Sequence, residues 1–153
     1  MTQVLWYGRG GQGAFTAARL LGAAYALSGN YALAFPSFGP ERRGAPMRAF
    51  TKLDTKPIVS RSEVKNADFT VILDDTLYDG DFGAGTVLVA TREIYALAER
   101  LKLPTVNTIM LGQLAAKLGV TPELLDGAIE TVMPERLWER NKNAIRATIP
   151  ESR

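Results

Sequence analysis

The stretch Gly8-Arg9-Gly10-Gly11-Gln12-Gly13 constrains the fold more than any other part of this chain. An apolar run, Val4-Leu5-Trp6-Tyr7, precedes the glycines, and an alanine- and leucine-rich run over residues 14–27 follows them. This order predicts a buried strand, a tight turn and a helix. Such a turn directs backbone N–H groups and the positive end of a helix dipole toward one point, which favours binding of a phosphate.

The spacing Gly8-x-Gly10-x-x-Gly13 also fits the dinucleotide-binding fingerprint, which requires the same strand-to-helix context. An NAD site needs a carboxylate about 20 residues further on to bind the ribose hydroxyls, but no Asp or Glu precedes Glu41. A Walker A loop needs Lys-Ser or Lys-Thr after its last glycine, where this chain has Ala14-Phe15. NAD binding and nucleotide hydrolysis are therefore disfavoured. A freestanding NADP- or nucleotide-binding protein stays open, as does a turn whose glycines serve packing alone.

The chain contains neither cysteine nor histidine among its 153 residues. Its side chains therefore exclude disulfides, thiolate-ligated zinc, iron–sulfur clusters and a histidine general base. Hydrophobic residues make up 46% of the chain, enough for the core of one domain over residues 1–153. The acids Asp74, Asp75, Asp79 and Asp81 follow a predicted strand, where aspartates more often form turns than hold metal. We expect no metal site and no catalytic residue.

Charge and hydropathy limit the partners of the chain. A formal net charge of +2 gives no argument for nucleic acid. No apolar run reaches the roughly 20 residues that a membrane helix needs. We therefore expect a cytoplasmic protein that binds neither nucleic acid nor a membrane.

Apolar runs alternate with helical patterns, which predicts an α/β fold: a three-layer α/β/α domain with a mixed, Rossmann-like sheet. Strands are expected over residues 3–7, 31–35, 47–53, 69–73 and 86–90, with a short one over 57–60. Helices are expected over residues 14–28, 92–101, 108–118, 122–132 and 134–147. The strands that follow the proline-rich segment look like a hairpin, so a purely parallel sheet is disfavoured.

That proline-rich segment, Pro36-Ser37-Phe38-Gly39-Pro40-Glu41-Arg42-Arg43-Gly44-Ala45-Pro46, is the second notable constellation. Its prolines and glycines forbid regular structure. A loop braced in this way holds the guanidinium groups of Arg42 and Arg43 toward a phosphate at low entropic cost. The alternative is a solvated turn in which Glu41 pairs with one arginine. In a doubly wound sheet, this loop and the glycine turn would lie at the same edge.

Taken together, these motifs resemble the gamma subunit of 2-oxoacid:ferredoxin oxidoreductases of the pyruvate synthase type. Residues 8–18 are similar to its first signature and the proline-rich segment to its second. Later segments resemble further signatures in the same order: Ile58-x-x-Arg61-Ser62, Leu73-Asp74-x-Thr76-Leu77 and Asn107-Thr108-x-Met110-Leu111-Gly112. The resemblance covers nearly the whole chain. Members of this family are usually longer between the last two segments, which implies that residues 79–103 lack a strand and its connection.

The resemblance implies a subunit of an enzyme that oxidatively decarboxylates a 2-oxoacid, forms an acyl-CoA and passes electrons to ferredoxin. It places thiamine diphosphate, Mg²⁺ and iron–sulfur clusters on alpha-, beta- and delta-type partner subunits. For this chain it implies a non-catalytic part that helps assembly and receives coenzyme A. The residues hypothesised to bind the CoA phosphates are Arg9, Gly10, Gly11, Gln12, Gly13, Arg42 and Arg43. A structural subunit whose glycine turn and proline-rich loop only bind neighbouring chains is the remaining alternative.

Overall fold

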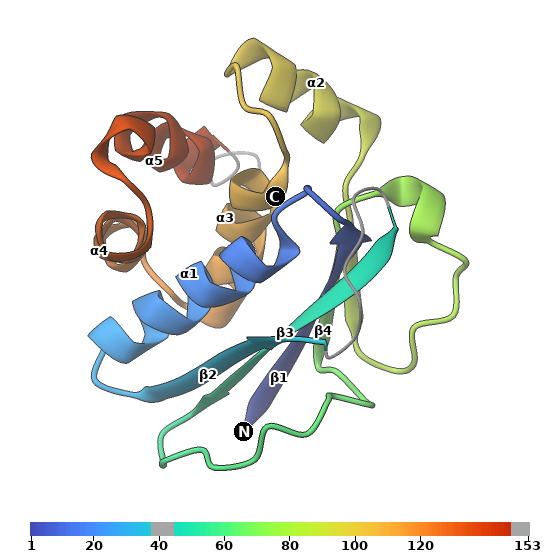
Figure 1. Ribbon diagram of the computed structural model, residues 1–153, viewed down its shortest axis with the longest axis vertical. Helices are drawn as coiled ribbons and strands as arrows, with labels where there is room; N and C mark the ends of the chain where they lie inside the picture. The colour runs from blue at the N-terminus through green and yellow to red at the C-terminus, as the bar shows by residue number, and fades with distance from the viewer. Residues whose placement is uncertain (38–44, 148–153) are drawn as a thin grey trace.

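The computed structural model describes residues 1–37 and 45–147 (Figure 1). Within these ranges the strands are β1 (Thr2–Arg9), β2 (Tyr31–Pro36), β3 (Pro46–Asp54), β4 (Phe69–Ile72) and β5 (Thr86–Val89). They form one mixed sheet in the order β2-β3-β1-β4-β5. β1 is parallel to β4 and β4 to β5, whereas β3 is antiparallel to both β1 and β2.

The α-helices of the described residues are α1 (Ala14–Leu27), α2 (Arg92–Arg100), α3 (Asn107–Leu118), α4 (Pro122–Val132) and α5 (Trp138–Ala147). Two short 3-10 turns, η1 (Asp75–Leu77) and η2 (Glu135–Leu137), complete the regular structure of this part of the chain. Helices α1, α3, α4 and α5 lie together on one face of the sheet (Figure 1). Helix α2 joins the same core through Ile94 and Ala98.

The opposite face of the sheet is covered by loops rather than by α-helices of the described chain. Loop residues 63–67 and 79–83 line a cavity against this face together with Tyr7 and Phe50. Phe82 packs on Tyr7 with ring centroids 5.8 Å apart. The α/β class and the mixed sheet are therefore confirmed. On this side of the sheet, the outer layer consists of the loops that connect the strands.

Most of the elements expected from the sequence are confirmed with small shifts of their ends. Thr91 and Thr121 cap α2 and α4 by accepting the N–H groups of Ile94 and Leu124, both at 3.3 Å. The short strand predicted over residues 57–60 is wrong, because that stretch has no strand pairing. Pro57 offers no N–H to a ladder, and the stretch runs out into solvent, where Val59 is 92% exposed.

Buried polar side chains fix how α1 sits on the sheet. The indole Nε1 of Trp6 on β1 donates to the Thr51 hydroxyl on β3 at 3.0 Å. That hydroxyl donates in turn to the carbonyl oxygen of Ala18 on α1, also at 3.0 Å. Because both contacts are buried, they hold α1 in one position over β1 and β3. The start of α1 is thereby placed at the carboxyl end of β1.

Candidate functional site

The glycine turn, residues 8–13, joins β1 to α1 at the carboxyl end of the central strand. Gly11 (φ +94°) and Gly13 (φ +81°) adopt left-handed backbone conformations that L side chains rarely take. Two backbone donors expected to bind phosphate are used inside the protein. The N–H of Gly10 donates to the carbonyl oxygen of Ala45 at 2.8 Å, and that of Gln12 to the carbonyl oxygen of Arg9 at 3.1 Å.

Among the described residues, the backbone donors left for a ligand are therefore the N–H groups of Gly11 and Gly13 and those at the start of α1. The first N–H groups of a helix have no partner within the helix. The N-cap residue of α1 is Gly13, which has no side chain with which to cap them. The positive end of the helix dipole lies at the same place. An anion is the class of ligand that suits this end of the sheet.

The side chains of Arg9 and Gln12 turn toward Asp74, the residue that follows β4 and Leu73. Arg9 Nε donates to Asp74 Oδ2 at 3.2 Å, and Gln12 Nε2 donates to the same oxygen at 3.0 Å. Gln12 Oε1 accepts the backbone N–H of Arg9 at 2.6 Å. Arg9 Nη2 also donates to the Thr76 hydroxyl at 3.0 Å. The side chains of Arg9 and Gln12, two of the four predicted to bind phosphate, are thus engaged in an internal network.

Asp74 is held on its other side by Thr76. Its Oδ1 accepts the Thr76 hydroxyl at 2.6 Å and the Thr76 backbone N–H at 3.0 Å. Burial raises the pKa of Asp74, but the hydrogen bonds from Thr76 and Gln12, with the charge of Arg9, outweigh it. The pKa of this carboxyl therefore lies below its usual value of 3.8. Asp74 is ionised at neutral pH and offsets the positive charge of Arg9.

Asn107, the first residue of α3, holds the other end of the turn. Its Nδ2 donates to the carbonyl oxygen of Gly13 at 3.2 Å. Its Oδ1 accepts the Thr105 hydroxyl at 2.5 Å and the Thr108 N–H at 3.0 Å. A Cβ on Gly13 would lie 3.0 Å from Asn107 Cγ and would overlap Nδ2. The starts of α1 and α3 therefore lie side by side with no room for a side chain at position 13.

A cavity of about 340 Å³ opens beside the turn, between the end of β4, α2 and the loop that precedes α3. Gln12, Leu73, Tyr95 and Thr105 are among the residues that line it. The Tyr95 hydroxyl donates to the carbonyl oxygen of Leu73 and accepts the N–H of Asp75, both at 3.1 Å. Burial raises the pKa of Tyr95, so this hydroxyl stays neutral at physiological pH.

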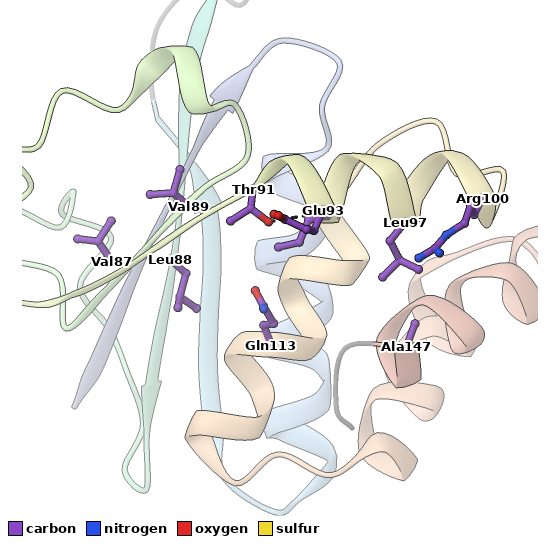
Figure 2. A pocket seen from close by; sticks show the side chains of 10 residues that line it. Val87, Leu88, Val89, Thr91, Glu93, Leu97, Arg100, Gln113 and Ala147 are labelled. Carbon is purple, nitrogen blue, oxygen red and sulfur yellow. Dashed lines mark hydrogen bonds between the residues drawn. The ribbon is translucent and has the colours of Figure 1, made fainter. Parts of the chain in front are cut away.

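A larger cavity of about 430 Å³ lies at the β5 edge of the sheet, and Figure 2 shows the side chains that line it. Leu88 of β5 points toward Gln113 of α3, and Leu97 and Arg100 of α2 face Ala147 at the end of α5. This cavity shares no lining residue with the one beside the turn. No sequence motif pointed to it, because its walls mix half-buried residues of β5 and α3 with exposed residues of α2 such as Glu93 and Arg100.

The two arginines Arg42 and Arg43 lie outside the described residues, so their predicted role stays a prediction. Both ends of the loop that carries them are described. Ser37 donates its N–H to the carbonyl oxygen of Arg48 at 2.9 Å, and Pro46 pairs with Arg9 in the sheet. With the contact from Gly10 to Ala45, this confirms that the loop begins and ends at the same sheet edge as the glycine turn.

The strand order bears on the NADP alternative. In the dinucleotide-binding fold, the second strand lies next to the first and its end reaches the ribose. Here β3 lies between β1 and β2. Residues at the end of β2 are therefore one strand further from the turn than a ribose-binding group would be, which speaks against NADP.

Within residues 1–37 and 45–147, no three His, Cys, Asp or Glu side chains gather in a way that could hold a metal ion. No helix in these ranges combines the length and hydropathy of a bilayer-spanning segment.

The chain matches known proteins over nearly its whole length. The pyruvate ferredoxin/flavodoxin oxidoreductase family model matches residues 3–150. The pyruvate synthase subunit PorC of Methanothermobacter thermautotrophicus is 40% identical over 172 aligned positions, covering 99% of this chain and 96% of the relative. The common gamma subunit of the pyruvate/ketoisovalerate oxidoreductases of Pyrococcus furiosus is 37% identical, covering 95% and 94%. Since the first alignment exceeds the 153 residues here by 19 positions, this chain lacks residues that its relative has.

Solved structures agree with this match. The PORC subunit of pyruvate oxidoreductase from Thermotoga maritima superposes with a TM-score of 0.78 at 30% identity, covering 95% of this chain and 93% of that one. The 2-oxoglutarate:ferredoxin oxidoreductase of Magnetococcus marinus, solved with 2-oxoglutarate, coenzyme A and succinyl-CoA bound, gives a TM-score of 0.74 at 14% identity. The match covers 95% of this chain and 30% of that one, and it is a likeness of fold alone. The family model and the relatives together show that this chain belongs to the pyruvate ferredoxin/flavodoxin oxidoreductase family, as a gamma-type subunit.

Proposed function

We propose that this chain is a non-catalytic subunit of an enzyme that converts a 2-oxoacid, coenzyme A and oxidised ferredoxin into acyl-CoA, CO2 and reduced ferredoxin. Family membership supports the subunit role. The side-chain inventory supports the non-catalytic role, because a chain without cysteine offers no thiolate to an iron–sulfur cluster. Thiamine diphosphate with Mg²⁺ and the clusters would then be held by alpha-, beta- and delta-type subunits, and ferredoxin would dock on the assembled, cytoplasmic complex.

The glycine turn would contribute to binding of the CoA phosphates. The observation that carries this proposal is the start of α1, where Gly13 leaves the first N–H groups of the helix without a side-chain cap. Coenzyme A carries a diphosphate and a 3′-phosphate, so it presents the anionic groups that such a helix start favours. Because Asp74 already offsets Arg9, most of the positive charge would have to come from Arg42 and Arg43.

The test uses the whole complex, purified through a tag on this chain. Arg42→Ala/Arg43→Ala should raise the apparent KM for CoA at least tenfold, the equivalent of about 1.4 kcal/mol. The KM for the 2-oxoacid and the rate of CoA-independent decarboxylation should not change. Arg136→Ala/Arg140→Ala is the matched control, because it removes the same charge from two exposed positions near and in α5. An intact complex with an unchanged KM for CoA would overturn the CoA assignment, and full activity without this chain would overturn the subunit role.

A further inference from the structure

The residues that hold the glycine turn come from two signature segments that have no role so far. Asp74 belongs to Leu73-Asp74-x-Thr76-Leu77, and Asn107 opens Asn107-Thr108-x-Met110. We propose that Asp74 and Asn107 are positioning residues that fix the turn in its phosphate-binding conformation. This inference rests on the function proposed above and names the residues that act through the turn rather than on the ligand.

The hydrogen bonds of Asp74 show where this carboxylate acts. An ionised carboxylate accepts about four hydrogen bonds through its two oxygens. Asp74 accepts four: Gln12 Nε2 and Arg9 Nε on Oδ2, and the N–H and hydroxyl of Thr76 on Oδ1. Groups of the protein therefore occupy all of the hydrogen-bond acceptor positions of this carboxylate. Asp74 connects the turn to the end of the neighbouring parallel strand β4, which makes it a brace of the turn.

Gln12 belongs to the same hydrogen-bond network. Both ends of its amide are used, because Oε1 accepts the Arg9 N–H and Nε2 donates to Asp74. A Cβ on Gly8 would lie 3.0 Å from Oε1, so the Gln12 side chain is folded closely over the end of β1. Gln12 therefore orients the turn and Arg9, with one N–H of its amide committed to Asp74. A site held in this way loses less entropy when a ligand binds.

Asn107 acts on the helix end of the turn. The carbonyl oxygen of Gly13 accepts the Asn107 amide and also the first helical bond from Ala17, at 3.2 and 3.0 Å. Asn107 is nearly buried, and its Oδ1 is fixed by Thr105 and Thr108. Its amide therefore sets the direction of the first peptide of α1. The orientation of that peptide in turn determines the direction in which the first N–H groups of α1 point toward a bound anion.

The test exchanges donor and acceptor between positions 12 and 74 in the assembled complex. Gln12→Glu alone sets two carboxylates against each other, and Asp74→Asn alone leaves a donor facing a donor. The double variant Gln12→Glu/Asp74→Asn restores the hydrogen bond between positions 12 and 74 with reversed polarity, and the carboxylate at position 12 would replace Asp74 Oδ2 as the acceptor for Arg9 Nε. Each single change should raise the KM for CoA about tenfold, and the double variant should return it to within about threefold of the wild type. Asn107→Asp, which replaces the Nδ2 donor by an oxygen, should also raise it about tenfold.

Several readouts separate positioning from a general loss of structure. The kcat at saturating CoA, the KM for the 2-oxoacid and the yield of complex should stay at wild-type values in every variant. If a single variant does not assemble, the double variant decides alone: a wild-type KM for CoA supports the proposal, and a raised one overturns it. Wild-type values in all of these variants, with a raised KM in Arg42→Ala/Arg43→Ala, would overturn the positioning roles and leave the CoA function standing. Wild-type values in that arginine variant as well would remove the CoA function itself.

Discussion

Gly13 is the residue at which backbone conformation, packing and the proposed site meet. Its φ of +81° costs any L residue about 1–2 kcal/mol, and its Cβ position is taken by Asn107. Gly29, which follows the end of α1, has a φ of +91° with nothing within 4 Å of its Cβ position. Gly13→Ala should therefore destabilise the purified subunit by at least about 1 kcal/mol more than Gly29→Ala in urea unfolding.

Gly29→Ala is the control because it imposes the same backbone strain in open space. Removing the neighbour gives a second check: in an Asn107→Ala background, Gly13→Ala should cost about as much as Gly29→Ala does. Equal costs for the two glycine substitutions in the wild-type background would mean that α1 and α3 do not approach as closely as described.

At the residue scale, the sequence predicts the turn but not the partners of its side chains. The glycines between an apolar run and a helix specify a turn locally, so the order of strand, turn and helix is confirmed, although β1 continues through Gly8 and Arg9. The partners of Arg9 and Gln12 lie more than 60 positions further along the chain. They meet only because β4 pairs in parallel with β1, and no local pattern encodes that pairing. From the sequence alone, Asp74 is therefore a loop acid within a signature segment, with no partner assigned to it.

At the scale of elements, the chain from Trp6 through Thr51 to Ala18 joins two strands and a helix by two buried hydrogen bonds. Thr51→Val keeps the shape of the side chain but leaves the indole N–H and the carbonyl oxygen without this partner. We expect a loss of about 1–3 kcal/mol in the free energy of unfolding, because buried polar groups are costly to leave unpaired. Thermal unfolding followed by tryptophan fluorescence would measure it.

Thr70→Val on β4 is the matched control for that change. Thr70 is 2% exposed, and it lines the cavity on the loop-covered face of the sheet. The same substitution there should cost less than about 1 kcal/mol. If the two variants lose the same stability, the hydrogen-bonded chain does not contribute beyond ordinary packing.

Local signals explain which elements were predicted well. The caps at Thr91 and Thr121 and the apolar spacing of α3 act within one helical turn, so the sequence displays them directly. Whether a strand is central or at an edge depends on the whole sheet. The strand predicted over residues 31–35 is the edge strand β2, and Tyr31 is 47% exposed. An edge strand and a buried strand are hard to distinguish from six residues.

The whole molecule is asymmetric about its sheet, because helices cover one face and loops cover the other (Figure 1). Lys52 on β3 shows how the loop after β3 is held. It is only 4% exposed; its Nζ donates to the carbonyl oxygen of Ser60 at 3.1 Å and lies 5.6 Å from the ring centroid of Phe35. A lysine buried in this way acts as an anchor for the loop.

Lys52→Met should release the loop without unfolding the domain. Methionine keeps the apolar stem against Phe35, while Ser60 is exposed and its carbonyl can bond to water instead. Tryptic cleavage after Arg61, followed by mass spectrometry, should therefore become several-fold faster, with a change of less than about 1 kcal/mol in the free energy of unfolding. Lys56→Met, at an exposed position of the same loop, should leave that cleavage rate unchanged. Faster cleavage with unchanged stability would show that the loop opens while the rest of the domain stays folded. Equal cleavage rates in both variants would mean that contacts other than those of Lys52 hold the loop against the sheet.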